Sequence, residues 1–280
     1  MDGILIINKP KGYTSHDIVN VLRKKLNTRK IGHTGTLDPN ATGVLPILIG
    51  QATKVSKYLI EHNKEYIAEL KLGEQTTTGD LEGKIINKKE VKDINKERIE
   101  EVLKKFIGEQ LQTPPIYSAI KVNGKKAYEY ARSNEAVVLE PRKVNISNIK
   151  LLDYKDNVIT YKVNCSKGTY IRVLCEEIAQ NLGTLGTMQN LVRTKVDKFK
   201  IEDAIELEKV EKNIKLLSIE EVFCDKEKIV IDNSKVTFFL NGVKLTYNMS
   251  DGVYRIYEEN LNFLGLGIIE NKLLKRDVII

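Results

Sequence analysis

The pattern of apolar residues changes near residue 225, and this change constrains the fold more than any other feature of the sequence. Upstream, short apolar runs are interspersed with stretches in which apolar residues recur every three or four positions, so both strands and helices are expected there. Downstream, short alternating runs are separated by Asn-Gly, Asp-Gly and Glu-Asn turns, which are typical of a small β structure. We therefore expect an α+β domain over residues 1–222 and a β module over residues 226–280.

The apolar pattern of the upstream domain also predicts where its elements lie. These are a strand over residues 3–10, a helix begun by Ser15, a strand from Val44, a helix over 52–62, a strand over 65–73, a helix capped by Asn95, strands near 144–152 and 158–164, and a helix over 169–182 that ends at Gly183. The helix after Asn95 is expected to have an apolar face that extends to Ile107.

Charge and composition narrow the class of protein. The formal net charge is +7, and basic and acidic residues are equal in number from Glu227 onward, so the whole excess lies upstream. Such a balance makes nucleic acid a plausible partner. The three cysteines and three histidines show no spacing typical of a disulfide framework or a metal site. With no secretion signal and no apolar run of about 18 residues, we expect a cytoplasmic protein without metal or membrane contact.

Asp38 is the first candidate for chemistry, because it lies in a loop rich in Gly and Thr between two apolar elements. An Asp-Pro pair often does no more than begin a turn, and that reading stays open. Against it stands the density of polar side chains, since His33, Thr34 and Thr36 occur within the same six residues. Nearby glycines allow a ligand to approach the backbone closely.

Arg172 is the second candidate, because a cation in the first turn of a helix opposes the helix dipole. A carboxylate or phosphate partner would offset that cost, although an exposed arginine could also reach solvent. Tyr66 and Tyr170 could be functional aromatics or ordinary packed rings. Taken alone, Asp80 is a typical solvated turn residue, and Leu191 is a typical core residue.

Taken together, these segments resemble the TruB family of tRNA pseudouridine synthases. The segments that carry the resemblance, in chain order, are NKPKGYTS (8–15), GHTGTLDPNATGVLPI (32–47), KEYIAELKLG (64–73), TTTGDLEG (76–83), QTPPIYSAIKVNGKKAYEYAR (112–132), GTYIR (168–172) and MQNLVRT (188–194). Thr194 stands where the family usually has a second arginine. Residues 252–269 are similar to the end of a PUA-type RNA-binding module.

The resemblance implies both a fold and a reaction. The fold is a pseudouridine-synthase domain around a mixed, mostly antiparallel sheet, with a short PUA-like module appended. The reaction is isomerisation of uridine to pseudouridine at position 55 in the T loop of tRNA, without cofactor or metal. The tRNA T arm is the implied partner, the protein is expected to act as a monomer, and no obligatory protein partner is implied.

The resemblance also assigns roles to individual residues. Asp38 is the nucleophile, and the Arg172 guanidinium orients it and lowers its pKa; the route, attack on C1′ or another, stays open. Tyr66 stacks on the uracil and helps remove the C5 proton. Tyr170 and Leu191 complete the pocket, Lys9 and Pro10 support Tyr66, His33 fills the space left by the flipped base, and Asp80 engages a neighbouring base. Apart from the resemblance, we expect the basic, Tyr-bearing region from Gln112 to Arg132 and beyond, within residues 105–140, to close over the RNA, although such charge runs also occur on solvated faces.

Three other readings remain. The chain could be an RNA-binding or RNA-folding protein whose catalysis is dispensable. It could be the related guide-RNA-dependent synthase of a ribonucleoprotein, although the GKKAYEYAR segment and the short tail favour the stand-alone type. A hydrolase that uses Asp38 is least favoured, because the same loop lacks a second carboxylate.

Overall fold

The computed structural model describes residues 1–133 and 135–280. Its first part contains β1 (Gly3–Lys9), α1 (Ser15–Lys25), β2 (Ile31–His33), β3 (Thr42–Ile49), α2 (Ser56–Ile60), β4 (Lys64–Leu72), β5 (Glu74–Thr76), β6 (Ile85–Lys88), α3 (Lys96–Lys104) and β7 (Gly108–Gln112). It continues with β8 (Lys121–Val122), β9 (Lys125–Lys126), α4 (Ala127–Arg132), β10 (Arg142–Lys155), β11 (Val158–Cys165), α5 (Ile171–Asn181), β12 (Gly186–Val196), β13 (Phe199–Lys200), β14 (Ile205–Glu206) and α6 (Ile219–Val222). The last part contains β15 (Lys228–Ile231), α7 (Asn233–Leu240), β16 (Leu245–Thr246), β17 (Gly252–Glu258), β18 (Phe263–Glu270) and β19 (Leu273–Ile279).

A ten-stranded sheet organises the larger part of the molecule. Its main path runs β14-β1-β3-β12-β4-β11-β10-β7, with β2 paired to β3 and β13 to β12. Neighbours are parallel only where β1 meets β14 and where β3 meets β12; every other pair is antiparallel. The expectation of a mixed, mostly antiparallel sheet is confirmed.

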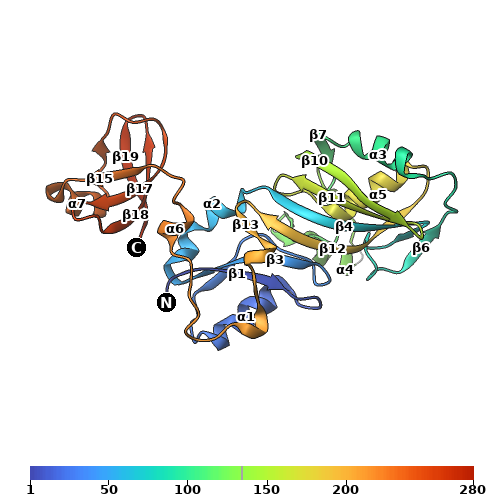
Figure 1. The fold of residues 1–280 in the computed structure, drawn as a ribbon, viewed down its shortest axis with the longest axis horizontal. Coiled ribbons are helices and arrows are strands. Elements are labelled where there is room, and N and C mark those ends of the chain that lie inside the picture. Colours follow the sequence, from blue (N-terminus) through green and yellow to red (C-terminus); the bar gives the residue numbers. More distant parts are fainter. Residues whose placement is uncertain (134) are drawn as a thin grey trace.

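Helices cover different halves of this sheet. The alternation of β4 turns Tyr66, Ala68 and Leu70 into a core that also contains residues of α3 and α5. On the other half, Ile18 and Leu22 of α1 pack against residues of β1 and β3. Figure 1 shows α3 and α5 beside β10 and β11, and α1 beside β1.

Several helices differ from those expected. The one expected over residues 52–62 is α-helical only over Ser56–Ile60 and follows a 3-10 helix over Gly50–Val55. Thr14, not Ser15, caps α1, because its side chain and that of Asp17 form a reciprocal capping box. Ser15 is buried instead. The apolar face after Asn95 stops short of Ile107, whose exposed fraction is 47%, because α3 already ends at Lys104.

The C-terminal β module is a five-stranded sheet in the order β15-β17-β18-β19-β16, with α7 beside it. It lies at one end of the long axis of the molecule, and α3 lies near the other (Figure 1). Leu266 and Val278 of this sheet are buried in one apolar cluster with Leu59 and Phe223. Asp277 also bonds across the junction to the side chains of Lys57 and Tyr58. Within the described part of the chain, no helix is long and apolar enough to cross a membrane.

Candidate active site

The loop between β2 and β3 carries Asp38, and buried polar contacts fix it from below. Ser15 at the start of α1 uses its hydroxyl to accept from the Leu37 amide (2.9 Å) and to donate to the Leu37 carbonyl (3.2 Å). The buried Lys9 ammonium donates to the carbonyl of Pro39 (3.0 Å). The residues before and after Asp38, Leu37 and Pro39, are therefore both fixed by hydrogen bonds.

Arg172, from the first turn of α5, meets Asp38 across the site. Its Nε lies 3.0 Å from Asp38 Oδ2, and its Nη2 lies 3.4 Å from Asp38 Oδ1. The pair therefore has the two-point geometry that fixes a carboxylate in direction as well as position. The Arg172 side chain is 6% exposed, whereas Asp38 keeps 39% of its surface open.

The remaining donors of Arg172 bind the loops around it. Nη1 donates to the Thr78 carbonyl (3.1 Å) and lies 3.8 Å from a carboxylate oxygen of Asp80. Nη2 donates to the Tyr117 carbonyl (3.0 Å). The guanidinium therefore joins three loops that are far apart in the sequence.

Arg172 lowers the pKa of Asp38, as expected, but it is not the largest influence on that pKa. The guanidinium does lower the pKa of Asp38, but burial raises it by more, and the nearby Asp80 raises it further. The pKa of Asp38 therefore lies above its ordinary value of 3.8. Arg172 limits this rise and so favours the ionised form that a nucleophile requires.

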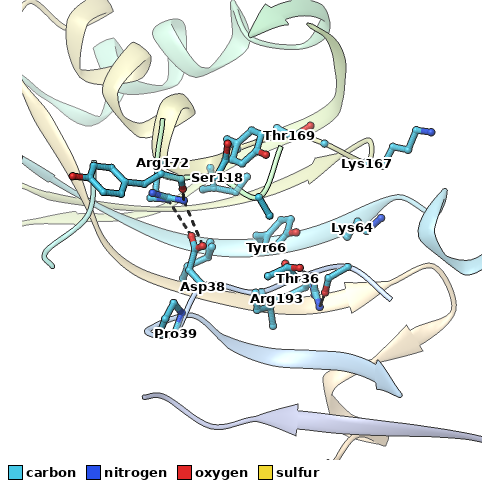
Figure 2. A pocket seen from close by; sticks show the side chains of 18 of the residues that line it. Thr36, Asp38, Pro39, Lys64, Tyr66, Ser118, Lys167, Thr169, Arg172 and Arg193 are labelled. Carbon is cyan, nitrogen blue, oxygen red and sulfur yellow. Dashed lines mark hydrogen bonds and ion pairs between the residues drawn. The ribbon is translucent and has the colours of Figure 1, made fainter. Parts of the chain in front are cut away.

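A cavity of about 500 Å³ opens beside this ion pair. Five of the residues expected at the site line it: Asp38, Tyr66, Tyr170, Arg172 and Leu191. In Figure 2, the ring of Tyr66 lies on the wall opposite Ser118 and Thr169, with Asp38 and Arg172 toward one end. The cavity thus combines a carboxylate with an aromatic ring that is 8% exposed.

The two tyrosines of the cavity are held in different ways. Burial raises the pKa of Tyr66, so its hydroxyl stays protonated at neutral pH. Gln112 fixes the backbone at Tyr170 by accepting from its amide (2.7 Å) and donating to its carbonyl (3.2 Å). Burial raises the pKa of Tyr170 as well.

The other four expected residues lie outside this cavity. Lys9 donates to the carbonyls of Pro10, Tyr13 and Pro39, so its hydrogen bonds hold the Asp38 loop and its own turn rather than Tyr66. Asp80 lines a smaller recess of about 50 Å³, which Asp38 and Leu191 share.

Pro10 follows β1 directly, and His33 ends β2; both are partly buried. The Nδ1 atom of His33 finds no hydrogen-bond partner among the described residues. Burial and the nearby Arg193 lower its pKa, so the imidazole is neutral at pH 7.

Sequence reasoning missed several polar residues that line the cavity, among them Lys64, Arg193 and Ser118. Lys64 lies two positions before Tyr66 on the same face of β4, and Arg193 lies opposite Tyr66 on β12. The Ser118 hydroxyl is buried and makes no hydrogen bond with the described residues. Only the first had a signal in the sequence, namely the period of two that relates Lys64 to Tyr66. No group of three or more His, Cys, Asp or Glu side chains among the described residues could hold a metal ion.

Comparison with known proteins gives a consistent result along the chain. Residues 23–171 match the N-terminal domain of TruB family pseudouridylate synthases, and residues 172–224 match the C-terminal domain of tRNA pseudouridylate synthase B. The tRNA pseudouridine synthase B of Alkaliphilus oremlandii is 43% identical over 284 residues, covering 97% of this chain and 94% of the relative. That of Clostridium kluyveri is 43% identical over 277 residues, covering 96% of each.

Solved structures agree on the fold. A chain in an H/ACA ribonucleoprotein bound to a substrate RNA containing 2′-deoxyuridine has a TM-score of 0.73 at 24% identity, covering 99% of this chain and 85% of that one. A chain of a Cbf5-Nop10-Gar1 complex has a TM-score of 0.73 at 26% identity, covering 99% of this chain and 83% of that one.

Proposed function

The chain belongs to the TruB family of pseudouridylate synthases, and from that premise we propose that it isomerises uridine-55 in the T loop of tRNA to pseudouridine. One observation supports the chemistry above all others. The Asp38 carboxylate is gripped at two points by Arg172, at the edge of a cavity that also contains the ring of Tyr66.

The reaction moves one bond and exchanges protons. The C1′–N1 bond breaks with its electron pair on N1, the uracil turns, and C5 bonds to C1′. The C5 proton leaves and N1 gains one, so the product has the formula of the substrate. Such an isomerisation needs no oxidant, reductant or group donor. Asp38 supplies the negative charge at C1′, either by covalent attack or by assisting another route.

The other site residues hold the base while it is detached. Tyr66 stacks on the uracil, and a stack of this kind contributes about 1–3 kcal/mol. Tyr170 and Leu191 contribute to the walls of the cavity. Because the pKa of Tyr66 is raised, its hydroxyl is protonated at rest and can take the C5 proton only while it passes its own proton on.

The target must leave its stack to reach Asp38, at a cost of a few kcal/mol. We assign His33 to the space that the base vacates and Asp80 to a neighbouring base. The segment within residues 105–140, of which residue 134 lies outside the described part, closes over the RNA. Its link to the chemistry is the hydrogen bond from Arg172 to the Tyr117 carbonyl. Equal protease sensitivity of this segment with and without tRNA would count against closure.

At the level of domains, residues 1–222 carry catalysis and the PUA-like residues 226–280 assist RNA binding. The enzyme acts in the cytoplasm as a monomer on the tRNA T arm. Although one structural neighbour was solved within a Cbf5-Nop10-Gar1 complex, we expect this chain to work without a protein partner. A guide-dependent synthase would not convert bare T-arm RNA, so conversion by the purified chain alone would distinguish the two kinds of enzyme.

The decisive test is to map pseudouridine in a T-arm transcript after incubation with purified protein and no additives. Asp38→Ala should abolish the product while tRNA affinity stays within about tenfold, because only the chemistry loses its carboxylate. Pseudouridine formed by Asp38→Ala would refute the nucleophile assignment. Tight binding by a wild type that makes no product would instead indicate an RNA-binding or RNA-folding protein.

A further inference from the structure

Two buried cations in the cavity have no carboxylate partner. Lys64 is 7% exposed and Arg193 is 1% exposed. Lys64 donates to the carbonyls of Ile60 (2.9 Å) and His62, while Arg193 donates to the carbonyls of Val44 (2.7 Å, from Nε) and Gly35 (3.1 Å, from Nη2). None of the ion pairs formed by the described residues includes either side chain.

The other charges that line the cavity are already balanced. Arg172 pairs with Asp38, and Lys167 pairs with Glu61. The positive charges of Lys64 and Arg193 are therefore left over. Buried charges are normally paired, because burying a charge away from water without a counter-charge costs free energy. An excess of this kind indicates that an anion occupies the cavity during function.

The position of the two cations shows which part of a bound nucleotide they would face. Lys64 and Tyr66 lie on the same face of β4, and Arg193 stands opposite Tyr66 in the pairing of β4 with β12. A Cβ placed on Gly35 would lie 3.5 Å from Arg193 Nη1 and 3.9 Å from Lys64 Cε, so both cations flank one loop residue. Figure 2 shows Lys64, Tyr66 and Arg193 on the same wall. Because a flipped nucleotide enters base first, groups this deeply buried face the base rather than the phosphates.

The reaction itself generates an anion at this place. When the C1′–N1 bond breaks, its electron pair stays on the uracil, and the negative charge spreads over N1, O2 and O4. This charge forms whether Asp38 attacks C1′ or the sugar follows another route. Fixed positive groups aimed at charge that develops during a reaction stabilise the transition state more than the ground state.

We propose that Lys64 and Arg193 stabilise the negative charge that develops on the uracil as it separates from the ribose. The assignment rests on the proposed function and adds two catalytic residues to it. The protonation of Lys64 is compatible with this role. Burial and the adjacent Arg193 lower the pKa of Lys64 to about 8, so the side chain is still mostly charged at pH 7. Of the other nearby groups, Lys167 also lowers this pKa, whereas Glu61 and Cys165 raise it.

The test compares two substrates in wild type and in Lys64→Gln, a change that removes the charge but keeps a hydrogen-bond donor. With uridine at the target of a T-arm transcript, the single-turnover rate of C1′–N1 cleavage should fall by about 100-fold or more, as when one donor is removed from an oxyanion site. The dissociation constant should change less than threefold. With 5-fluorouridine the loss in cleavage rate should be several times smaller, because fluorine already stabilises the departing base.

Lys71→Gln is the matched control, because it makes the same change of charge on the opposite face of the same strand, at a side chain that is 41% exposed. It should alter neither the rate nor the affinity. If Lys64→Gln fails to fold, Lys64→Arg and Arg193→Lys keep the charge, and their rates should stay within about tenfold of wild type.

Two results would overturn the proposal. Weaker binding with a smaller salt dependence and an unchanged rate would place a backbone phosphate at these cations. If Lys64→Gln lowers the cleavage rate equally for uridine and 5-fluorouridine, Lys64 has only a structural role in the pocket. Wild-type conversion of uridine is measured in the same experiment, so failure of the proposed function is seen separately.

Discussion

At the scale of single residues, the site depends on how Asp38 is kept ionised in a recess that disfavours charge. Burial raises the pKa of Asp38 and Arg172 lowers it, and burial prevails. Arg172 has a second role besides its effect on that pKa, because its two-point contact fixes the direction of the Asp38 carboxylate. Both roles lead to measurable consequences.

The first consequence concerns pH. If the ionised carboxylate is the reactive form, kcat/KM should fall as pH decreases through the raised pKa of Asp38, which lies above 3.8. A profile of kcat/KM on T-arm RNA between pH 4 and 8 checks this. Arg172→Gln should move the acid midpoint upward, because the group that lowers the pKa is lost. A wild-type midpoint at or below that of an ordinary aspartate would contradict the assignment.

The second consequence concerns geometry. Arg172→Lys keeps the charge but cannot contact both carboxylate oxygens of Asp38 and also bind the Thr78 and Tyr117 carbonyls. We expect kcat to fall by about 100-fold with a smaller change in KM, measured by steady-state conversion. Arg29→Lys, at an exposed arginine, is the control and should keep wild-type kinetics. An Arg172→Lys enzyme of normal kcat would show that charge alone suffices.

Some of these residues could be found in the sequence and others could not. Asp38 lies in a loop dense with glycine and threonine, and Arg172 is a cation in the first turn of a helix, so both point to a site, whereas Tyr66 receives its role only from the family resemblance. Apart from the period of two that relates Lys64 to Tyr66, Lys64 and Arg193 are distinguished by being buried without an ion-paired carboxylate, and that is a property of the folded chain. The net direction of the Asp38 pKa likewise depends on burial that no sequence pattern displays.

At the scale of elements, β12 is the feature that the sequence conceals. It runs through the middle of the large sheet, parallel to β3 and antiparallel to β4. Two register shifts along its pairing with β4 break the alternation of buried and exposed residues, so no period of two is visible. By contrast, α5 follows the helical period and ends before Gly183, whose φ of +84° suits a glycine.

The junction of β3 and β12 gives a test of this arrangement. Gly43 has a φ of +103°, and a Cβ there would overlap the backbone of Arg193. Gly43→Ala should therefore reduce the free energy of unfolding by more than about 2 kcal/mol, measured by urea denaturation.

Gly12→Ala provides the matched control, because Gly12 also has a positive φ, +87°, but has open space around it. It should cost only about 1 kcal/mol, from backbone strain alone. Equal losses in the two variants would mean that the close approach of β3 and β12 does not limit the substitution.

At the scale of the whole molecule, the two sheets share part of their cores. The change of pattern near residue 225 marks the start of the second sheet, but it gives no sign of how that sheet is attached. Leu266 and Val278 are fully buried against the first domain, and Asp277 bonds to Tyr58 across the junction. The β module is therefore joined by packing as well as by the chain.

This attachment predicts a single unfolding transition. Leu266→Ala should lower the free energy of unfolding by about 2–5 kcal/mol, because it leaves a cavity in the shared cluster. Signals from the two domains should move together during urea denaturation. Phe238→Ala, at a side chain that is 57% exposed in the module, should change stability by less than about 0.5 kcal/mol. Separate midpoints for the two domains would show that the junction contributes little.

The shared cluster also limits how freely the tail can be exchanged. A C-terminal β module taken from a relative would bring different side chains to the junction between the two domains. There they would have to pack against Leu59 and Phe223 of the first domain. Hybrid proteins should therefore fold well only when the contacting residues of both domains are exchanged together. The two domains are then expected to evolve as a matched pair.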